Sequence, residues 1–289
     1  MPKPRASCVA GSWYPGTAAE AAAAVDRYCG AWPAQPRAGV RGGILPHAGW
    51  LYSGGTAGAT FAALAGQQPE TCVVFGAVHV PGVQRVALSD HDGWETPLGT
   101  IACDQELGAA VMDLGPGLVA ADGGAHRREH SIEIEVPFIQ RRFPGARLLA
   151  LMVPPDGHAA HAGEVVAQAA SKLGRRVLYF GSTDLTHYGP RYAFTPKGVG
   201  WAALQWSKNE NDRRMLDLIQ RLDAEQAVPE AHENCNACGA GAIAAALAAA
   251  RAEGATRAEI LHHTTSHDIL PEGIPEDFVG YGAAVFIGG

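Results

Sequence analysis

The feature that most constrains the fold is the alternation of short, continuously apolar segments with segments of helical pattern along 289 residues. Strands that alternate with helices predict an α/β fold with a central, largely parallel mixed sheet. Strands that are apolar throughout suit a sheet covered by helices on both faces. We expect strands at 43–45, 72–75, 148–153, 177–180, 260–261 and 283–287, and helices at 56–67, 105–114, 131–143, 161–173, 211–222 and 239–253.

The composition predicts one folded domain spanning residues 1–289. Apolar residues make up 47% and charged residues 18%, which excludes a disordered chain. The net charge of −7 argues against nucleic-acid binding, which usually needs a basic face. The longest uncharged run in a predicted helix, 239–250, is shorter than the roughly 20 residues that cross a bilayer. With no secretory signal at the N-terminus, we expect a cytoplasmic protein that does not enter membranes.

Three predicted strands are each followed by a histidine. His47 follows the strand at 43–45, His79 the strand at 72–75, and His187 the strand at 177–180. Ligands of open α/β sheets bind outside the carboxyl ends of the strands. Imidazole is the commonest protein ligand of metals, so the pattern favours a shared metal site. Three separate, solvated loop histidines are the alternative.

An aspartate accompanies the third of these histidines. Asp184 would share a face with His187 if it began a helical turn. Its carboxylate could then set the tautomer of the imidazole or take part in proton transfer. The alternative is an Asp helix cap followed by an exposed histidine.

Two cysteines, Cys235 and Cys238, precede the alanine-rich helix predicted at 239–253. A thiol at a helix N-terminus has a lowered pKa, so Cys238 could be a thiolate near neutral pH. A redox pair, half of a zinc site, a single ligand or nucleophile, and a buried small residue all remain open. A zinc ribbon would require a second CxxC motif, which the sequence lacks.

Acidic residues cluster at the start of the helix predicted at 131–143. Ser131 is a suitable N-cap, and Glu133 and Glu135 fall in the first turn, where the helix dipole favours carboxylates. Glu129 and His130 precede the cap and have no such explanation. The chain has no phosphate-binding loop, nucleophile elbow, HExxH or GxGxxG motif, which disfavours ATPases, serine hydrolases, zincins and dinucleotide enzymes.

Six short motifs stand along the chain: SWYP at 12–15, LPHAGWLYSG at 45–54, TPLG at 96–99, EHSIE at 129–133, STDLTH at 182–187 and ACG at 237–239. They occur in the order seen in Memo-like proteins, and the chain resembles this family from Ser12 to about Phe286. The resemblance implies a fold like that of the class III extradiol ring-cleavage dioxygenases, which are non-haem iron enzymes. Prokaryotic members are often named protein B of the AmmeMemoRadiSam system, which implies a radical-SAM partner.

The resemblance also implies a ligand set. The metal would be bound by His47, His79 and Cys238, with the catalytic residues Asp184 and His187 lining the same pocket. It thereby selects Cys238 as the ligand among the two cysteines. The extradiol enzymes have a carboxylate in place of this thiolate.

Two imidazoles and a thiolate leave coordination positions open for substrate. This donor set suits Fe(II), which we expect, and also copper or zinc. We therefore expect an iron oxidoreductase of the dioxygenase type, with a small phenolic, enolic or heterocyclic substrate. His187 would be the general acid/base, and Asp184 would orient it or accept a substrate proton. The alternatives are a metal- or partner-binding protein without turnover and a zinc-type hydrolase.

The remaining expectations concern the pocket. Glu129, His130, Trp50 and Tyr52 are the predicted substrate-binding residues. His267 stands where the family pattern suggests a small or polar residue; we expect a surface loop there, and an enlarged site is the other interpretation. A homo-oligomer and a radical-SAM protein are the macromolecular partners to consider.

Overall fold

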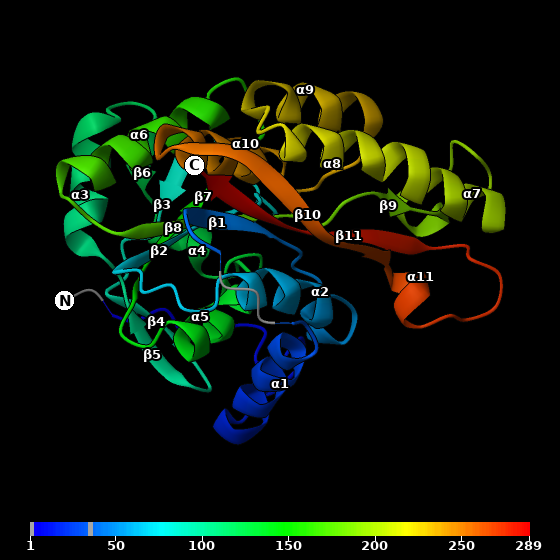
Figure 1. Cartoon of the computed structure of the whole chain (residues 1–289), viewed down its shortest axis with the longest axis horizontal. Helices are drawn as coiled ribbons and strands as arrows, with labels where there is room; N and C mark the ends of the chain where they lie inside the picture. The colour runs from blue at the N-terminus through cyan, green and yellow to red at the C-terminus, as the bar shows by residue number, and fades with distance from the viewer. Residues whose placement is uncertain (1–2, 34–36) are drawn as a thin grey trace.

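The computed structural model describes residues 3–33 and 37–289, and in these ranges nine strands form one large sheet (Figure 1). Its centre is a run of four parallel strands, which confirms the predicted largely parallel arrangement. In spatial order these are β1 (Val40–Leu45), β8 (Val177–Ser182), β2 (Thr71–Gly76) and β7 (Arg147–Met152).

Antiparallel pairings extend the sheet on both sides, so the sheet is mixed. Next to β1 lie β11 (Phe278–Gly288) and then β10 (Ala255–Thr265), and the short β9 (His187–Tyr188) also pairs with β11. Next to β7 lie β3 (Val86–Leu88) and β6 (Val119–Ala121), while β4 (Gly93–Thr96) and β5 (Gly99–Ala102) form a separate hairpin.

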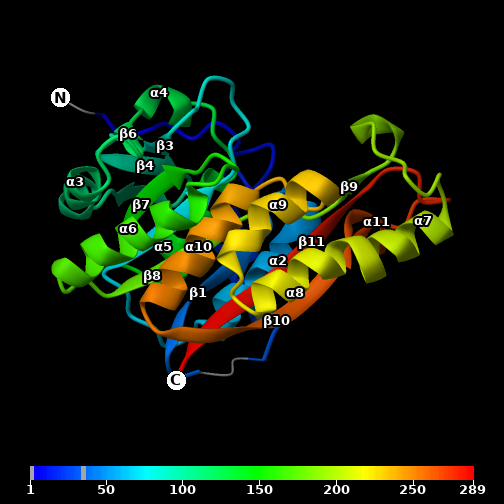
Figure 2. The same ribbon diagram turned by 90° about the horizontal axis from the view of Figure 1, so that it is seen from above.

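Helices cover both faces of the sheet, as predicted (Figure 2). Each face has its own apolar cluster, and the one sheet between them makes a single α/β domain. None of the helices in the described ranges has the length and apolar character that a membrane span requires. One face carries α3 (Gln105–Leu114), α6 (Ala159–Lys172), α8 (Asp212–Gln220), α9 (Ala224–Asn234) and α10 (Ala240–Ala252); the other carries α1 (Ala18–Gly30), α2 (Trp50–Ala63) and α5 (Val136–Arg142).

Several elements differ from the sequence prediction. The expected strand at 260–261 is the centre of the much longer β10, which lies at the sheet edge and is half-exposed, so it lacks a continuous apolar run. The strands β3 and β6, of three residues each, and the strands of the β4–β5 hairpin, of four residues each, are too short to stand out as apolar runs. Helix α9 was missed as well, and it contains an internal proline, Pro229.

The segment expected to be a helix from residue 131 is built differently. Ser131 is not an N-cap: its hydroxyl donates to Glu129 and accepts the N–H of Ala77. A 3-10 turn (Glu133–Glu135) precedes α5, and both glutamates are buried rather than exposed at a helix end. Their position therefore follows from tertiary contacts and not from the helix dipole.

An ion pair between Arg5 and Glu133 anchors the N-terminal segment inside the protein. Nη1 of Arg5 lies 2.6 Å from Oε2 of Glu133, and both side chains are buried. The guanidinium also donates to the carbonyl of His126 and lies 4.1 Å from the ring centre of Trp94. Oε1 of Glu133 accepts the hydroxyl of Tyr14 at 3.0 Å. Removing one partner would leave the other charge buried and unpaired.

We predict that Arg5→Ala lowers the free energy of unfolding by about 3–5 kcal/mol, because a buried carboxylate loses its counter-charge. Arg141→Ala is the control: Arg141 pairs with Asp26 at 2.7 Å, and both side chains are half-exposed. The free energy of unfolding of Arg141→Ala should fall by less than about 1 kcal/mol. Urea denaturation of both variants measures the difference, and equal losses would contradict the assigned role of the buried pair.

Candidate metal centre

The predicted site residues converge at the carboxyl ends of three neighbouring strands. His47 follows β1, His79 follows β2 and Asp184 follows β8, which lies between them in the sheet. A cavity of about 930 Å³ opens at this edge. Its lining includes these three residues together with His130 and His187. The strand-end prediction therefore holds for the placement of these side chains.

Two groups of metal-ligating side chains share His47. In each group the ligand atoms all lie within 4.8 Å of one another. His47, His79 and His130 form the first group, and His47, Asp184 and Cys238 form the second. The predicted ligand set of His47, His79 and Cys238 takes members from both groups. Among the described residues, His79 and Cys238 do not occur together in one such group.

Ser182, the last residue of β8, determines which nitrogen of His47 faces the site. The serine hydroxyl donates its single hydrogen to the carbonyl of Ser131 at 2.6 Å. It must therefore accept a hydrogen from Nδ1 of His47, 2.8 Å away. Nε2 of His47 is then unprotonated, and its lone pair faces Sγ of Cys238 at 3.2 Å.

Cys238 is held against the end of β8 by backbone contacts. Its N–H donates to the carbonyl of Asp184 at 3.2 Å, and the N–H of Asp184 contacts Sγ at 3.3 Å. The N–H of Gly239 donates to Oγ1 of Thr183. A Cβ on Gly239 would lie 2.3 Å from the carbonyl oxygen of Ser182, so only glycine allows this approach.

Burial keeps the histidines of the site neutral. It lowers the pKa of His79 to about 4, and it lowers the pKa values of His47 and His130 as well. For His47 and His79 the neighbouring imidazoles contribute in the same direction. Neutral imidazoles at pH 7 keep the lone pairs that bind a metal.

Burial acts in the opposite direction on the acidic groups. It raises the pKa of Asp184 to about 7 and raises the pKa of the Cys238 thiol, to which the nearby Asp184 carboxylate adds. Burial therefore acts against the lowering of the Cys238 pKa that the helix N-terminus was expected to cause. A divalent cation would stabilise both ionised forms, so this donor set fits a soft or borderline metal.

His187 reaches the cavity without the predicted helical turn. Residues 183–186 are not helical, and His187 begins β9. Its Nδ1 lies 3.1 Å from the carbonyl oxygen of Leu185, which can only accept, so Nδ1 carries the hydrogen and Nε2 is unprotonated. The ring packs edge-on against Tyr192.

The predicted substrate-binding residues divide into two pairs. His130 and Tyr52 line the cavity. Trp50 and Glu129 do not line it. Both are 3% exposed: the indole of Trp50 donates to the carbonyl of Ile134, and Glu129 binds the backbone of the turn that follows it. One lining residue that the sequence reasoning did not assign is Trp13, whose ring lies 4.7 Å from that of His130.

His267 is not on a surface loop. It lies in the short helix α11 (Ser266–Ile269), is 7% exposed and lines the cavity. Thr265 and Asp268 form a capping box that fixes this turn and thereby turns His267 inward. Cys235 is exposed and ends α9 with a left-handed backbone, φ 50°, and it belongs to neither ligand group.

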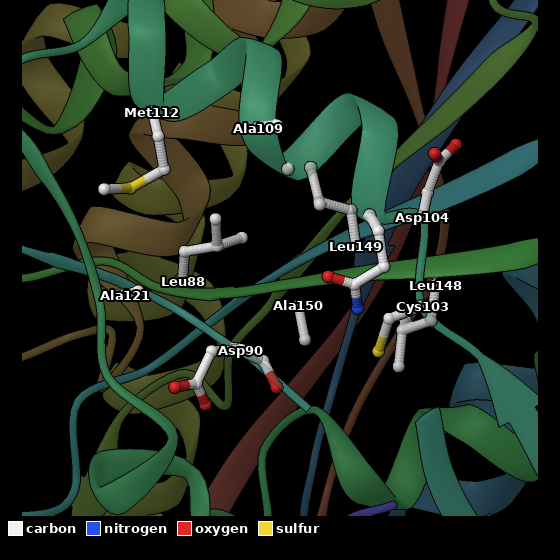
Figure 3. A pocket seen from close by; sticks show the side chains of 13 residues that line it. Leu88, Asp90, Cys103, Asp104, Ala109, Met112, Ala121, Leu148, Leu149 and Ala150 are labelled. Atoms are coloured by element: carbon white, nitrogen blue, oxygen red, sulfur yellow. The ribbon is translucent and has the colours of Figure 1, made fainter. Parts of the chain in front are cut away.

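A second, smaller cavity lies elsewhere, between α3 and the strands β3 and β7 (Figure 3). It has a volume of about 190 Å³, and Leu88, Cys103 and Met112 are among its lining residues. None of the members of the two ligand groups lines it. Four of the five members, His47, His79, His130 and Asp184, line the larger cavity instead, whereas Cys238 lines neither of the two.

The fold and the clustered donors define an α/β protein with a candidate metal centre at the carboxyl edge of its sheet. Residues 5–285 match the family described as Memo-like protein. A MEMO1 family protein of Thermococcus onnurineus is 34% identical over 292 residues, covering 98% of this chain and 99% of the relative. One of Methanothermobacter thermautotrophicus is 35% identical over 246 residues, covering 84% and 83%. The chain belongs to the Memo-like family.

We predict that Ser182→Ala weakens metal binding about 10- to 100-fold, because His47 loses the acceptor that fixes its tautomer and ring orientation. Chelator competition with Zn²⁺ measures the effect. Ser89→Ala is the matched control, since this buried hydroxyl accepts the indole N–H of Trp94 outside the site. Equal Zn²⁺ affinity of both variants would contradict the proposal that Ser182 orients His47 for metal binding.

Proposed function

We propose that this Memo-like protein is a metal-dependent oxidoreductase of the dioxygenase type that uses Fe(II). The observation that carries the proposal is the convergence of imidazole, thiol and carboxylate donors around His47, which lines a large cavity together with His79, His130 and Asp184. The resemblance of the family to class III extradiol enzymes supports iron among the metals that these donors suit.

His47, His79 and Cys238 are the proposed ligands. Bound Fe(II) would supply open coordination positions for a substrate oxygen and for dioxygen. His47 contributes the nitrogen that Ser182 leaves unprotonated. Cys238 would contribute its sulfur, which lies 3.2 Å from that nitrogen, so the two donor atoms are neighbours as ligands of one ion would be.

His187 and Asp184 would handle protons. Nε2 of His187 is unprotonated and lines the cavity, which suits acceptance of a phenolic proton from a bound substrate. Asp184 uses one carboxylate oxygen to accept the N–H of His47 at 2.8 Å. It thereby positions the loop of the first ligand, and its carboxylate is also a member of the ligand group with Cys238.

The shape of the cavity supports a small planar substrate. Trp13, Tyr52 and Tyr192 line it and offer aromatic faces to a phenolic, enolic or heterocyclic ring. His130, stacked on His79 with ring centres 4.8 Å apart, lines the same cavity. A cytoplasmic location, a homo-oligomeric assembly and a radical-SAM partner belong to the same proposal.

We predict that His47→Ala and Cys238→Ala lose most of the iron that survives desalting, while their far-UV circular dichroism stays that of the parent protein. Each variant removes a ligand without removing a core side chain. Elemental analysis after anaerobic Fe(II) loading gives the result, and about one iron per parent chain is expected. Full iron content in both variants would exclude the proposed ligand set.

Metal content also separates the alternatives. Stoichiometric iron with oxygen uptake on phenolic substrates would establish the oxidoreductase. Turnover without oxygen on a zinc-loaded protein would instead favour a hydrolase. Binding of metal with no turnover on any substrate class would favour a binding protein.

For His187→Ala we predict retained metal and a loss of about 100- to 10,000-fold in turnover, the range expected when a general acid/base is removed. The control is His161→Ala, because His161 is an exposed residue of α6. Oxygen uptake and elemental analysis are measured on the same samples. Loss of metal from His187→Ala would make this histidine a ligand.

A further inference from the structure

A turn of π-helix lies outside the proposed catalytic machinery but contacts it. Residues Ser207–Asn211 form this turn between α7 (Trp201–Trp206) and α8. Such insertions are rare, and they are frequent at functional sites. Here the turn is followed directly by α8, and the two residues at the junction, Asn211 and Asp212, are both fully buried. Figure 1 shows α8 beside α9 and above β10 and β11.

Asp212 holds the centre of the segment that carries Asp184 and His187. Its Oδ1 accepts the N–H of Thr186 at 3.0 Å. The carbonyl of Thr186 accepts the N–H of Gly280 at 2.9 Å. A Cβ on Gly280 would lie 2.3 Å from Oδ2 of Asp212, so a glycine is required for this close approach.

The second oxygen of Asp212 has its own partner. Oδ2 lies 2.8 Å from Nε2 of His263 on β10. The carboxylate is therefore fixed from two sides, by the backbone of residue 186 and by an imidazole of the edge strand. Because the Asp212 carboxylate is itself fixed, it can hold the backbone N–H of Thr186 in one position.

Asn211 connects the same segment to the one that delivers Cys238. Its Nδ2 donates to Oγ1 of Thr186 at 3.0 Å and to the carbonyl of Asn234 at 2.9 Å. Its own carbonyl accepts Nδ2 of Asn236 at 2.9 Å. Asn211 thus contacts both the segment at 183–187, which carries Asp184 and His187, and the segment that leads to Cys238.

We propose that Asn211 and Asp212 are positioning residues that set the placement of Cys238 relative to Asp184 and His187. The proposal rests on the proposed function, because it assigns to this pair the geometry of that site. The segment at 183–187 has no helix of its own, and the segment at 235–239 lies between two helices. Backbone hydrogen bonds fix part of both segments, and Asn211 and Asp212 add contacts to Thr186, Asn234 and Asn236.

The test measures Zn²⁺ affinity by chelator competition, together with the ring ¹⁵N resonances of His187 in the metal-free protein at neutral pH. Asn211→Ala should bind Zn²⁺ about 10- to 100-fold more weakly, as expected when support of a ligand is lost. Asp212→Ala should shift the His187 resonances, and Asp212→Asn should restore them, because its amide oxygen can still accept the Thr186 N–H. Asp217→Asn, an exposed change on the same helix, should match the parent in both measurements.

A purely structural role predicts a different result. The free energy of unfolding would fall, but Zn²⁺ affinity and the His187 resonances would stay those of the parent, and this outcome overturns the proposal. If Asn211→Ala does not fold, Thr186→Val removes the same hydrogen bond at nearly constant volume and should shift the His187 resonances. Absence of Zn²⁺ binding by the parent protein would refute the metal site, while the resonances of His187 would still decide the positioning role.

Discussion

The site depends on the close packing of residues 237–239 against the end of strand β8. Gly239 approaches the carbonyl of Ser182 so closely that any side chain would collide, and this approach brings Cys238 to His47. β8 lies between β1 and β2 in the sheet, so its end is also where the loops with His47 and His79 meet. At this strand end Ser182 also hydrogen-bonds to His47 and to the carbonyl of Ser131, the neighbour of His130 in sequence, so several of the segments that carry donors meet there.

Burial gives this arrangement its chemical character. The same desolvation keeps the imidazoles neutral and raises the pKa values of Asp184 and the Cys238 thiol. Ionising these two acids is unfavourable because they are buried. A bound cation would offset this cost, since its positive charge stabilises the carboxylate and the thiolate. Ser182 adds directionality, because its only hydrogen is donated to Ser131 and His47 must therefore present Nε2.

Much of the fold was predictable because the central strands are buried on both faces and consist of apolar residues. The central strands and six of the helices appear near their predicted positions, whereas the edge strand β10 is half-exposed and the strands β3 and β6 are only three residues long. Pairing with neighbours, rather than composition, makes these segments strands. The inward position of His267 likewise follows from the capping box of α11, and the buried role of Glu133 follows from Arg5, a residue 128 positions away.

The sequence by itself determined the α/β class, the placement of His47, His79 and Asp184 after strands, and membership in the Memo-like family. These follow from local composition and from motifs, which are readable along the chain. The tertiary structure alone decided that His130 joins the histidine group, that Trp50 and Glu129 lie outside the cavity, and that Asn211 and Asp212 hold two site segments. These are contacts between residues far apart in sequence, and their partners are selected by packing that no local pattern records.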